Sequence, residues 1–243
     1  MRKFIAFDSL LSSVRRCSQN YEMINEGDKI AVGVSGGKDS LALLCALAMM
    51  RRFYPVRYEV VAVTVDLGLD GMDFSAVEEL CRDLDVQYER VQTKIGEIVF
   101  EKNDEGCSLC SRLRRGALHN EAKRLGCNKV ALGHTKDDVA ETLLLNLFYA
   151  GKIEVFWPKN TPDEKDMTLI RPLIYTTEKT VKAFCSKNNI AVVKNTCPLD
   201  KKTKRKTAEE IIKAVDKENK GVLHRIFRAI EKSEIDGFKD FGE

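Results

Sequence analysis

Short apolar runs rich in β-branched residues recur along the chain, and segments with helical periodicity separate them. This alternation is typical of a parallel sheet whose strands are joined by crossover helices. It predicts an α/β fold with a doubly wound parallel sheet. The predicted strands are residues 29–34, 58–66, 87–91, 128–132 and 190–193, and the predicted helices are residues 38–51, 74–84, 112–125 and 137–149.

Helical periodicity also extends beyond the predicted sheet at both ends of the chain. Residues 4–23 predict an amphipathic flanking helix, and residues 207–215 and 222–230 predict two more. The proline-containing segment 157–166 predicts a loop, and it is the candidate for a mobile lid. The organisation we expect is an N-terminal helical segment (1–25), a central domain (26–200) and a basic C-terminal helical segment (201–243).

The chain of 243 residues has a hydrophobic content of 44%, which suits a globular core. No apolar stretch approaches the roughly 20 residues that span a bilayer, and the start of the chain lacks a secretory signal core. We therefore expect a cytoplasmic protein without a membrane partner. Because cytosolic thiols stay reduced, its eight cysteines are not expected to form disulfides, and metal binding has to be considered for some of them.

A glycine-rich turn follows the first predicted strand, with the sequence Gly33-Val34-Ser35-Gly36-Gly37-Lys38-Asp39-Ser40. A strand that breaks into glycines and then opens a helix exposes backbone N–H groups, which favour a bound phosphate. The spacing differs from that of a Walker A loop, and Ser35 stands where dinucleotide loops need their second glycine. A carboxylate inside a phosphate cradle is repulsive unless a cation lies between them, so Asp39 indicates Mg²⁺.

Residues 35–40 resemble the SGGxDS signature of the PP-loop ATPases, which cleave ATP to AMP and pyrophosphate. The resemblance implies a Rossmann-like fold of the adenine nucleotide alpha-hydrolase type. It also implies that the loop holds the pyrophosphate end of ATP, and that Val63, Val65 and Asp66 of the second strand line the adenine pocket. A glycine-rich turn without a ligand is the alternative.

Two cysteines, Cys107 and Cys110, lie at the start of a helix, whose positive end stabilises thiolates. By itself this pair fits a zinc half-site, a redox pair or two incidental thiols. Cys127 and His119 lie on or just past the same helix, so they are not expected to complete a site with the pair. Cys197 follows the last predicted strand and is the more attractive third ligand, because α/β loops at one sheet edge meet in space.

Three segments, residues 107–116, residues 133–138 and Arg171-Pro172-Leu173, resemble the tRNA 2-thiocytidine synthetase family (TtcA). The resemblance extends from about residue 26 to residue 214. In that family three cysteines bind a [4Fe-4S] cluster, and the corresponding residues here are Cys107, Cys110 and Cys197. Three thiolates leave one iron open for a sulfide nucleophile.

The same resemblance assigns further site residues. It implies that Gly133 and His134 lie near the nucleotide and that Asp138 lies at the reacting centre, as a metal ligand or proton acceptor. Of Asp137 and Asp138, we expect one to cap the following helix and the other to be catalytic. Arg114 lies one helical turn beyond Cys110, where it can balance charge on a phosphate or base.

Positive charge is clustered although the net charge is only +3. A basic run follows Cys197 closely, and we interpret it as a stripe that binds the phosphodiester backbone of tRNA. A solvated charge run is the alternative. The run consists of Lys201, Lys202, Lys204, Arg205 and Lys206.

The resemblance implies an ATP- and [4Fe-4S]-dependent tRNA sulfurtransferase that adenylates a base, cytidine 32, and replaces its oxygen with sulfur from sulfide or from a cysteine desulfurase. Lys194 and Thr135 depart from the family pattern and leave a tRNA-uridine thiolase of the same superfamily open. A ligase of the tRNA-lysidine synthetase type would not need the three cysteines, and a non-catalytic zinc-stabilised RNA-binding module would not need Asp39 or Asp138. A homodimer is also open.

Overall fold

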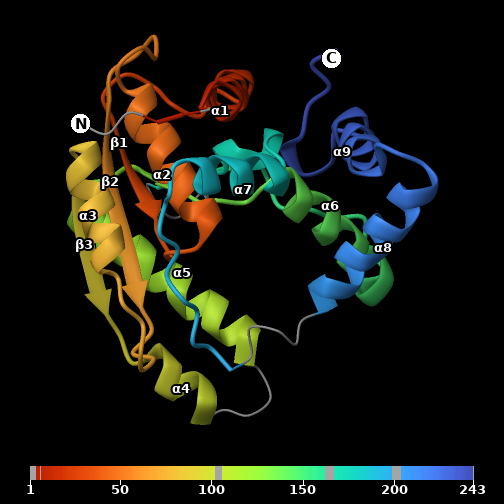
Figure 1. The fold of residues 1–243 in the computed structure, drawn as a ribbon. Coiled ribbons are helices and arrows are strands. Elements are labelled where there is room, and N and C mark those ends of the chain that lie inside the picture. Colours follow the sequence, from red (N-terminus) through yellow and green to blue (C-terminus); the bar gives the residue numbers. More distant parts are fainter. Residues whose placement is uncertain (1–3, 6, 102–105, 162–166, 199–203, 243) are drawn as a thin grey trace.

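Six strands form one sheet in the order β3-β2-β1-β4-β6-β5. Figure 1 shows the neighbouring strands β1, β2 and β3 of this sheet. The computed structural model describes residues 4–5, 7–101, 106–161, 167–198 and 204–242. Neighbouring strands pair in parallel except at one edge, where β5 is antiparallel to β6. The chain starts in the middle of the sheet and winds outward in both directions, so the predicted doubly wound α/β fold is confirmed. The strands are β1 (Asp28–Gly33), β2 (Tyr58–Asp66), β3 (Gln87–Gln92), β4 (Lys129–Ala131), β5 (Lys159–Asn160) and β6 (Thr168–Ile170).

Helices cover both faces of the sheet, and the central strand β1 is therefore buried on both sides. Because successive side chains of a strand point to opposite faces, Ile30 and Val32 join one core while Ala31 joins the other. The second core contains Leu118 and Ala122 of α5 (Gly106–Arg124). The helices that contribute side chains to the first core include α1 (Asp8–Asn20), α2 (Lys38–Met50), α3 (Ser75–Leu84) and α7 (Glu178–Lys187).

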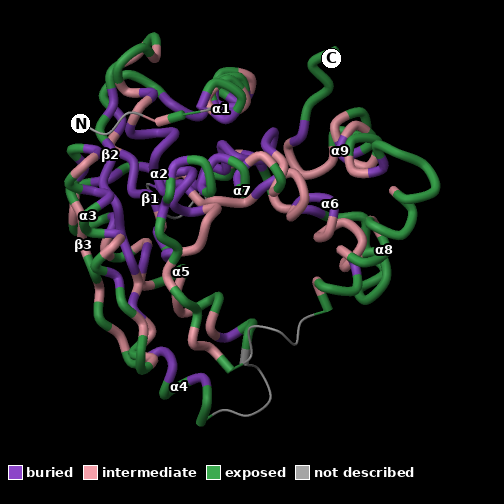
Figure 2. Tube along the Cα trace, viewed as in Figure 1, coloured by how far each residue is buried: buried purple, intermediate pink, exposed green. Residues whose placement is uncertain are grey.

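The C-terminal helices lie far from the β3 edge of the sheet, and the first of them is exposed along most of its length (Figure 2). Helix α6 (Lys136–Leu145) continues into a π-helix, η1 (Asn146–Ala150), and contacts both α8 (Lys204–Glu218) and α9 (Val222–Lys232). Phe227 of α9 is buried in the same core as α1 and α2. Within the described residues, no helix is both long and apolar enough to span a bilayer.

The prediction of a fifth parallel strand at residues 190–193 is wrong. Val193 donates its backbone N–H to the carbonyl oxygen of Gly36 at 3.0 Å, so this segment packs on the glycine turn and does not extend the sheet. The fifth parallel strand is β6, which pairs with β4 and contains only three residues. The predicted lid at residues 157–166 contains the edge strand β5, and residues 162–166 lie outside the described part.

Two helices have no counterpart among the predicted segments, and one predicted helix is divided. The additional helices are α4 (Ile95–Glu101) and α7. The predicted helix 137–149 ends as an α-helix at Leu145 and continues as η1. Two single-turn 3₁₀ helices complete the described structure, η2 (Pro172–Tyr175) and η3 (Ile235–Gly237).

Candidate active site

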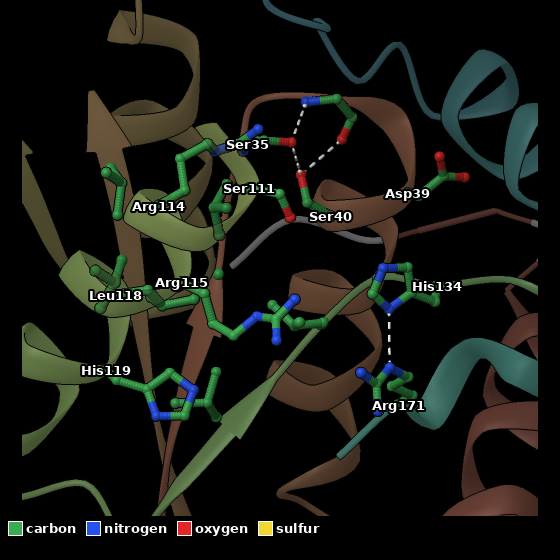
Figure 3. Close-up of a pocket in the computed structure, with 18 residues that line it drawn as sticks. Ser35, Asp39, Ser40, Ser111, Arg114, Arg115, Leu118, His119, His134 and Arg171 are labelled. Carbon is green, nitrogen blue, oxygen red and sulfur yellow. Dashed lines mark hydrogen bonds between the residues drawn. The ribbon is translucent and has the colours of Figure 1, made fainter. Parts of the chain in front are cut away.

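A cavity of about 320 Å³ lies at the carboxyl edge of the sheet, between the glycine turn after β1 and helix α5 (Figure 3). The neighbours of β1, namely β2 and β4, follow it in opposite directions across the sheet, and ligands of doubly wound folds bind at such a switch point. Most of the residues predicted to bind the nucleotide line this cavity. They are Gly33, Ser35, Gly37, Asp39, Ser40, Val63, Val65, Gly133 and His134, and Arg114 joins them from α5.

The glycine turn has a fixed backbone because its second glycine is enclosed. Gly36 has a φ of +81°, and a Cβ at this position would lie 2.4 Å from Cγ2 of Val193. Only glycine fits a positive φ under such a contact. Gly36 therefore does not line the cavity, while Gly37 lines it and caps α2.

Hydroxyl groups hold the two ends of the turn together. Ser40 Oγ donates to the carbonyl oxygen of Gly37 at 2.8 Å and lies 3.3 Å from Ser35 Oγ. Gly133 approaches from the end of β4, where a Cβ would lie 3.0 Å from the carbonyl group of Asp39. The absence of a side chain at residue 133 thus lets the turn after β4 lie directly on the start of α2.

Lys38 and Asp39 point toward a second cavity of about 440 Å³, which Asp39 shares with the first. Lys38 Nζ lies 2.9 Å from Asp39 Oδ2 and 2.8 Å from Glu178 Oε1. Burial alone would lower the pKa of Lys38, but these two carboxylates raise it above its ordinary value. Burial raises the pKa of Asp39, and Lys38 opposes this shift. The other oxygen of this carboxylate, Asp39 Oδ1, is buried and has no hydrogen-bond partner among the described residues.

Asp138 lines the second cavity and uses both of its carboxylate oxygens. Oδ2 accepts the backbone N–H of Thr135 at 2.8 Å in a capping box at the start of α6, and Oδ1 accepts from Arg205 Nη1 at 2.5 Å. Asp138 therefore takes part in the cap of α6, and the expectation that one of the two aspartates is catalytic stays a prediction. Thr135 is the N-cap, and Asp137 accepts the backbone N–H of Glu178 at the start of α7.

His134 lines the first cavity as a neutral side chain. Its Nδ1 accepts a hydrogen bond from Arg171 Nε at 3.0 Å (Figure 3). Burial lowers the pKa of His134 to about 4, and the charge of Arg171 contributes. The imidazole therefore carries no charge at neutral pH.

The structure brings the predicted third cysteine toward the Cys-x-x-Cys pair. The segment that follows α7 runs alongside α5 toward the start of that helix (Figure 1). Burial raises the pKa of Cys110, Arg114 lowers it, and the charges of Cys197 and Cys107 raise it further. Cys107 is exposed, while Cys110 and Cys197 are partly buried, and all three are free thiols.

Other predicted residues have partners outside the first cavity. Asp66 accepts from Arg90 Nη2 at 2.6 Å and from the backbone N–H of Gly68, so its carboxylate turns away from that cavity. In the basic run, Lys201 and Lys202 lie outside the described residues. Lys204, Arg205 and Lys206 form the first turn of α8, where Lys204 Nζ lies 4.6 Å from the ring centroid of Tyr149.

Several cavity residues were not predicted from the sequence. On α5 these residues follow one another at helical spacing on the face that also carries Arg114, so the periodicity of that helix was the available signal. Arg171 belongs to the Arg171-Pro172-Leu173 motif, which by itself indicates no role for the arginine. The residues are Val34 in the glycine turn, Ser111, Arg115, Leu118 and His119 on α5, Val130 in β4, Leu132 directly after β4, and Arg171.

The residues present fit both inorganic groups that the sequence predicts. The unpartnered Asp39 Oδ1 and the neighbouring carboxylate of Asp138 are hard oxygen donors of the kind that Mg²⁺ prefers. Cys107, Cys110 and Cys197 offer the thiol ligands of an iron-sulfur cluster, and the repulsion that raises the pKa of Cys110 would be relieved by a bound metal. Among the described residues, no group of three or more Cys, His, Asp or Glu side chains is arranged so that it could hold a metal ion.

Comparison with known proteins agrees with this geometry. Residues 10–214 match the model of the PP-loop domain. The chain is 38% identical to the tRNA-cytidine(32) 2-sulfurtransferase of Geobacter sulfurreducens over 231 residues, which cover 93% of this chain and 90% of the relative. The enzyme of the same name from Citrifermentans bemidjiense is 38% identical over 230 residues, with coverage of 93% and 90%.

Among solved structures, the fold is similar to that of the U34-tRNA thiolase NcsA from Methanococcus maripaludis with its [4Fe-4S] cluster. The TM-score is 0.74 and the identity 24%, and the match covers 92% of this chain and 78% of that chain. This likeness concerns the fold, whereas the sequence matches identify the family. The chain belongs to the PP-loop family and, within it, to the tRNA-cytidine(32) 2-sulfurtransferases.

Proposed function

We propose that the chain is an ATP-dependent tRNA sulfurtransferase that adenylates cytidine 32 and replaces the oxygen of this base with sulfur. The observation that carries the proposal is the convergence of two chemistries at one sheet edge. The glycine turn and α5 line a cavity of about 320 Å³, and α5 begins with the Cys-x-x-Cys pair. Cys197 lies near enough to this pair for its charge to raise the pKa of Cys110.

In the first half-reaction, the base oxygen attacks the α-phosphorus of ATP, a P–O bond forms, and the bond to the β-phosphate breaks to release pyrophosphate. The N–H groups at the start of α2 would bind the phosphates, and Val63 and Val65, which line the cavity, would contact the adenine. Asp39 and Asp138 would hold Mg²⁺ between themselves and the phosphates. Arg114 lies opposite the turn, where its charge stabilises the negative charge that develops on the α-phosphate.

In the second half-reaction, sulfide attacks the activated ring carbon, the C–O bond breaks, and AMP leaves with the former base oxygen. Adenylation is required because the base oxygen is a poor leaving group. Cys107, Cys110 and Cys197 would hold a [4Fe-4S] cluster, which supplies an iron with an open coordination position for the sulfur donor. We propose sulfide, or sulfur delivered by a cysteine desulfurase, as that donor.

The position of Arg114 couples the two halves of the site. It lies one helical turn after Cys110 and lines the nucleotide cavity, so one rigid helix carries both the thiols and the phosphate-facing cation. The target base has to leave its stack to reach this position, as in other enzymes that modify bases.

The decisive experiment is purification without oxygen, followed by measurement of iron, acid-labile sulfide and zinc. We expect iron and sulfide in the wild type, their loss in Cys197→Ala, and their retention in the matched control Cys127→Ala, a buried cysteine outside the site. Stoichiometric zinc without iron would overturn the cluster assignment.

A second experiment tests the reaction and its target. Transcripts that carry cytidine or uridine at position 32 are incubated with ATP and sulfide, and the nucleosides are analysed by mass spectrometry. We expect 2-thiocytidine with the wild type and no product with Asp39→Ala. Thiolated uridine would support the related uridine thiolase activity instead, and pyrophosphate release that persists in Asp39→Ala would refute the phosphate-site assignment.

A further inference from the structure

Arg171 is a buried arginine at the wall of the nucleotide cavity, and the proposed reaction assigns no role to it. Its Nε donates to His134 Nδ1 at 3.0 Å, and its Nη1 donates to the carbonyl oxygen of Trp157 at 2.5 Å. Its guanidinium carbon lies 4.9 Å from the ring centroid of Phe156. Three contacts made by different parts of the group fix the guanidinium in position and in orientation.

Phe156 also packs against the imidazole of His134, with ring centroids 4.6 Å apart and ring planes 30° apart. The same aromatic ring thus supports both partners of the hydrogen bond. Since Arg171 follows β6 and His134 follows β4, which is the adjacent parallel strand, the pair is held by the sheet as well as by Phe156.

The direction of this hydrogen bond determines where the imidazole carries its proton. Arginine offers only N–H donors, so Nδ1 of His134 has to be the acceptor and cannot carry a proton. A neutral imidazole then carries its single proton on Nε2. In Figure 3 the second ring nitrogen of His134 lies on the side of the ring that faces away from Arg171.

A protonated imidazole is excluded by the same surroundings. It would place an N–H on Nδ1 against the N–H of Arg171. Burial is the main cause that lowers the pKa of His134, and the positive charges of Arg171, Arg205 and Arg115 lower it further. Asp138 favours the charged form, but its carboxylate is already paired with Arg205.

We propose that Arg171 is a positioning residue that fixes His134 as the neutral Nε2–H tautomer, so that the turn after β4 presents a hydrogen-bond donor to the cavity. The acceptor is an oxygen or ring nitrogen of the bound nucleotide, and in this respect the inference rests on the proposed function. His134 is then the group that touches the ligand, and Arg171 acts through it.

The tautomer can be measured directly by long-range ¹H–¹⁵N correlation spectroscopy of ¹⁵N-labelled protein without ligand. The chain contains only three histidines, and His134→Gln identifies the signals of interest. We expect the Nε2–H pattern for His134 in the wild type and a mixture of both tautomers in Arg171→Met. Arg171→Gln keeps an N–H donor without the charge, so it should retain the wild-type pattern. Arg115→Gln removes a nearby charge but no hydrogen bond to His134, and it should retain the pattern as well.

Titration with ATP connects the tautomer to the ligand. The loss of one fixed donor should weaken ATP binding by about tenfold in Arg171→Met, and Arg171→Gln should restore most of it. Comparing pyrophosphate with adenosine in the same variants identifies the acceptor, because only the ligand that carries it loses affinity.

Three results would overturn the inference: an Nδ1–H pattern in the wild type, an unmixed Nε2–H pattern in Arg171→Met, or equal ATP affinity in Arg171→Met and the wild type. If Arg171→Met does not fold, the wild-type spectrum and Arg171→Gln still decide the question. A wild type that has the expected tautomer but binds no ATP would refute the proposed function and not the role of Arg171 in holding His134.

Discussion

Substitution of Gly36 by alanine tests whether the glycine turn is held by its backbone geometry. The left-handed conformation at φ +81° costs an L-residue about 1–2 kcal/mol. The added Cβ would also lie 2.4 Å from Cγ2 and 2.6 Å from Cβ of Val193, an overlap whose relief costs a further ~1–3 kcal/mol. We therefore expect a loss of about 2–5 kcal/mol in the free energy of unfolding, which lowers Tm by about 4–20 °C for a chain of this size.

Gly37→Ala is the matched control, one residue away. Gly37 has a φ of −74°, and its added Cβ would meet no atom nearer than Ser35 Oγ at 3.4 Å. This variant should keep the Tm within about 2 °C of the wild type, because the alanine adopts the native backbone without strain. It should nevertheless weaken ATP binding, since Gly37 lines the cavity and Gly36 does not.

Thermal unfolding followed by circular dichroism, with ATP titration at a temperature where all variants are folded, separates the two effects. A Gly36→Ala variant with the wild-type Tm would refute the steric reasoning. Equal destabilisation of both variants would mean that the turn tolerates no side chain at either position, and the distinction between an enclosed glycine and a ligand-facing glycine would fail.

Three further predictions follow from buried or paired charges. Asp28→Asn breaks a buried ion pair, in which Asp28 lies 2.6 Å from Lys129 and the two side chains are 4% and 5% exposed. Urea denaturation should show that the free energy of unfolding falls by about 3–5 kcal/mol and that adding Lys129→Met recovers part of this loss. An unchanged free energy of unfolding would contradict the prediction. Because the folded-state pKa of His134, about 4, lies below the unfolded-state value of about 6.5, unfolding takes up a proton in this range and stability falls as the pH falls. Relative to His134→Gln, the wild type should lose about 3 kcal/mol between pH 6.5 and pH 4, and parallel pH profiles would refute this. Arg205→Ala frees a carboxylate oxygen of Asp138, so calorimetry should find Mg²⁺ bound about two- to fivefold more tightly, and unchanged affinity would count against a cation site there.

The local chemistry of this protein can be read from the sequence because it resides in contiguous segments. The glycine turn, the Cys-x-x-Cys and the turn after β4 each combine a strand or helix end with polar residues at fixed spacing. Continuous apolar runs gave the central strands β1 and β2, which are buried on both faces and therefore show no polar alternation. These features were sufficient for the fold class and the family.

The tertiary structure alone decided which distant segments meet. Residues 190–193 are as apolar and β-branched as a strand, yet Val193 packs on Gly36, while the three-residue β6 takes the place beside β4. Strand pairing depends on which edge is free and on the connections on either side, and no local pattern encodes that choice. The sequence could not show the long-range partners of Asp138, Asp66 and Arg171 for the same reason. Each pairs with a residue at least 24 positions away, so its hydrogen bond exists only once the chain has folded.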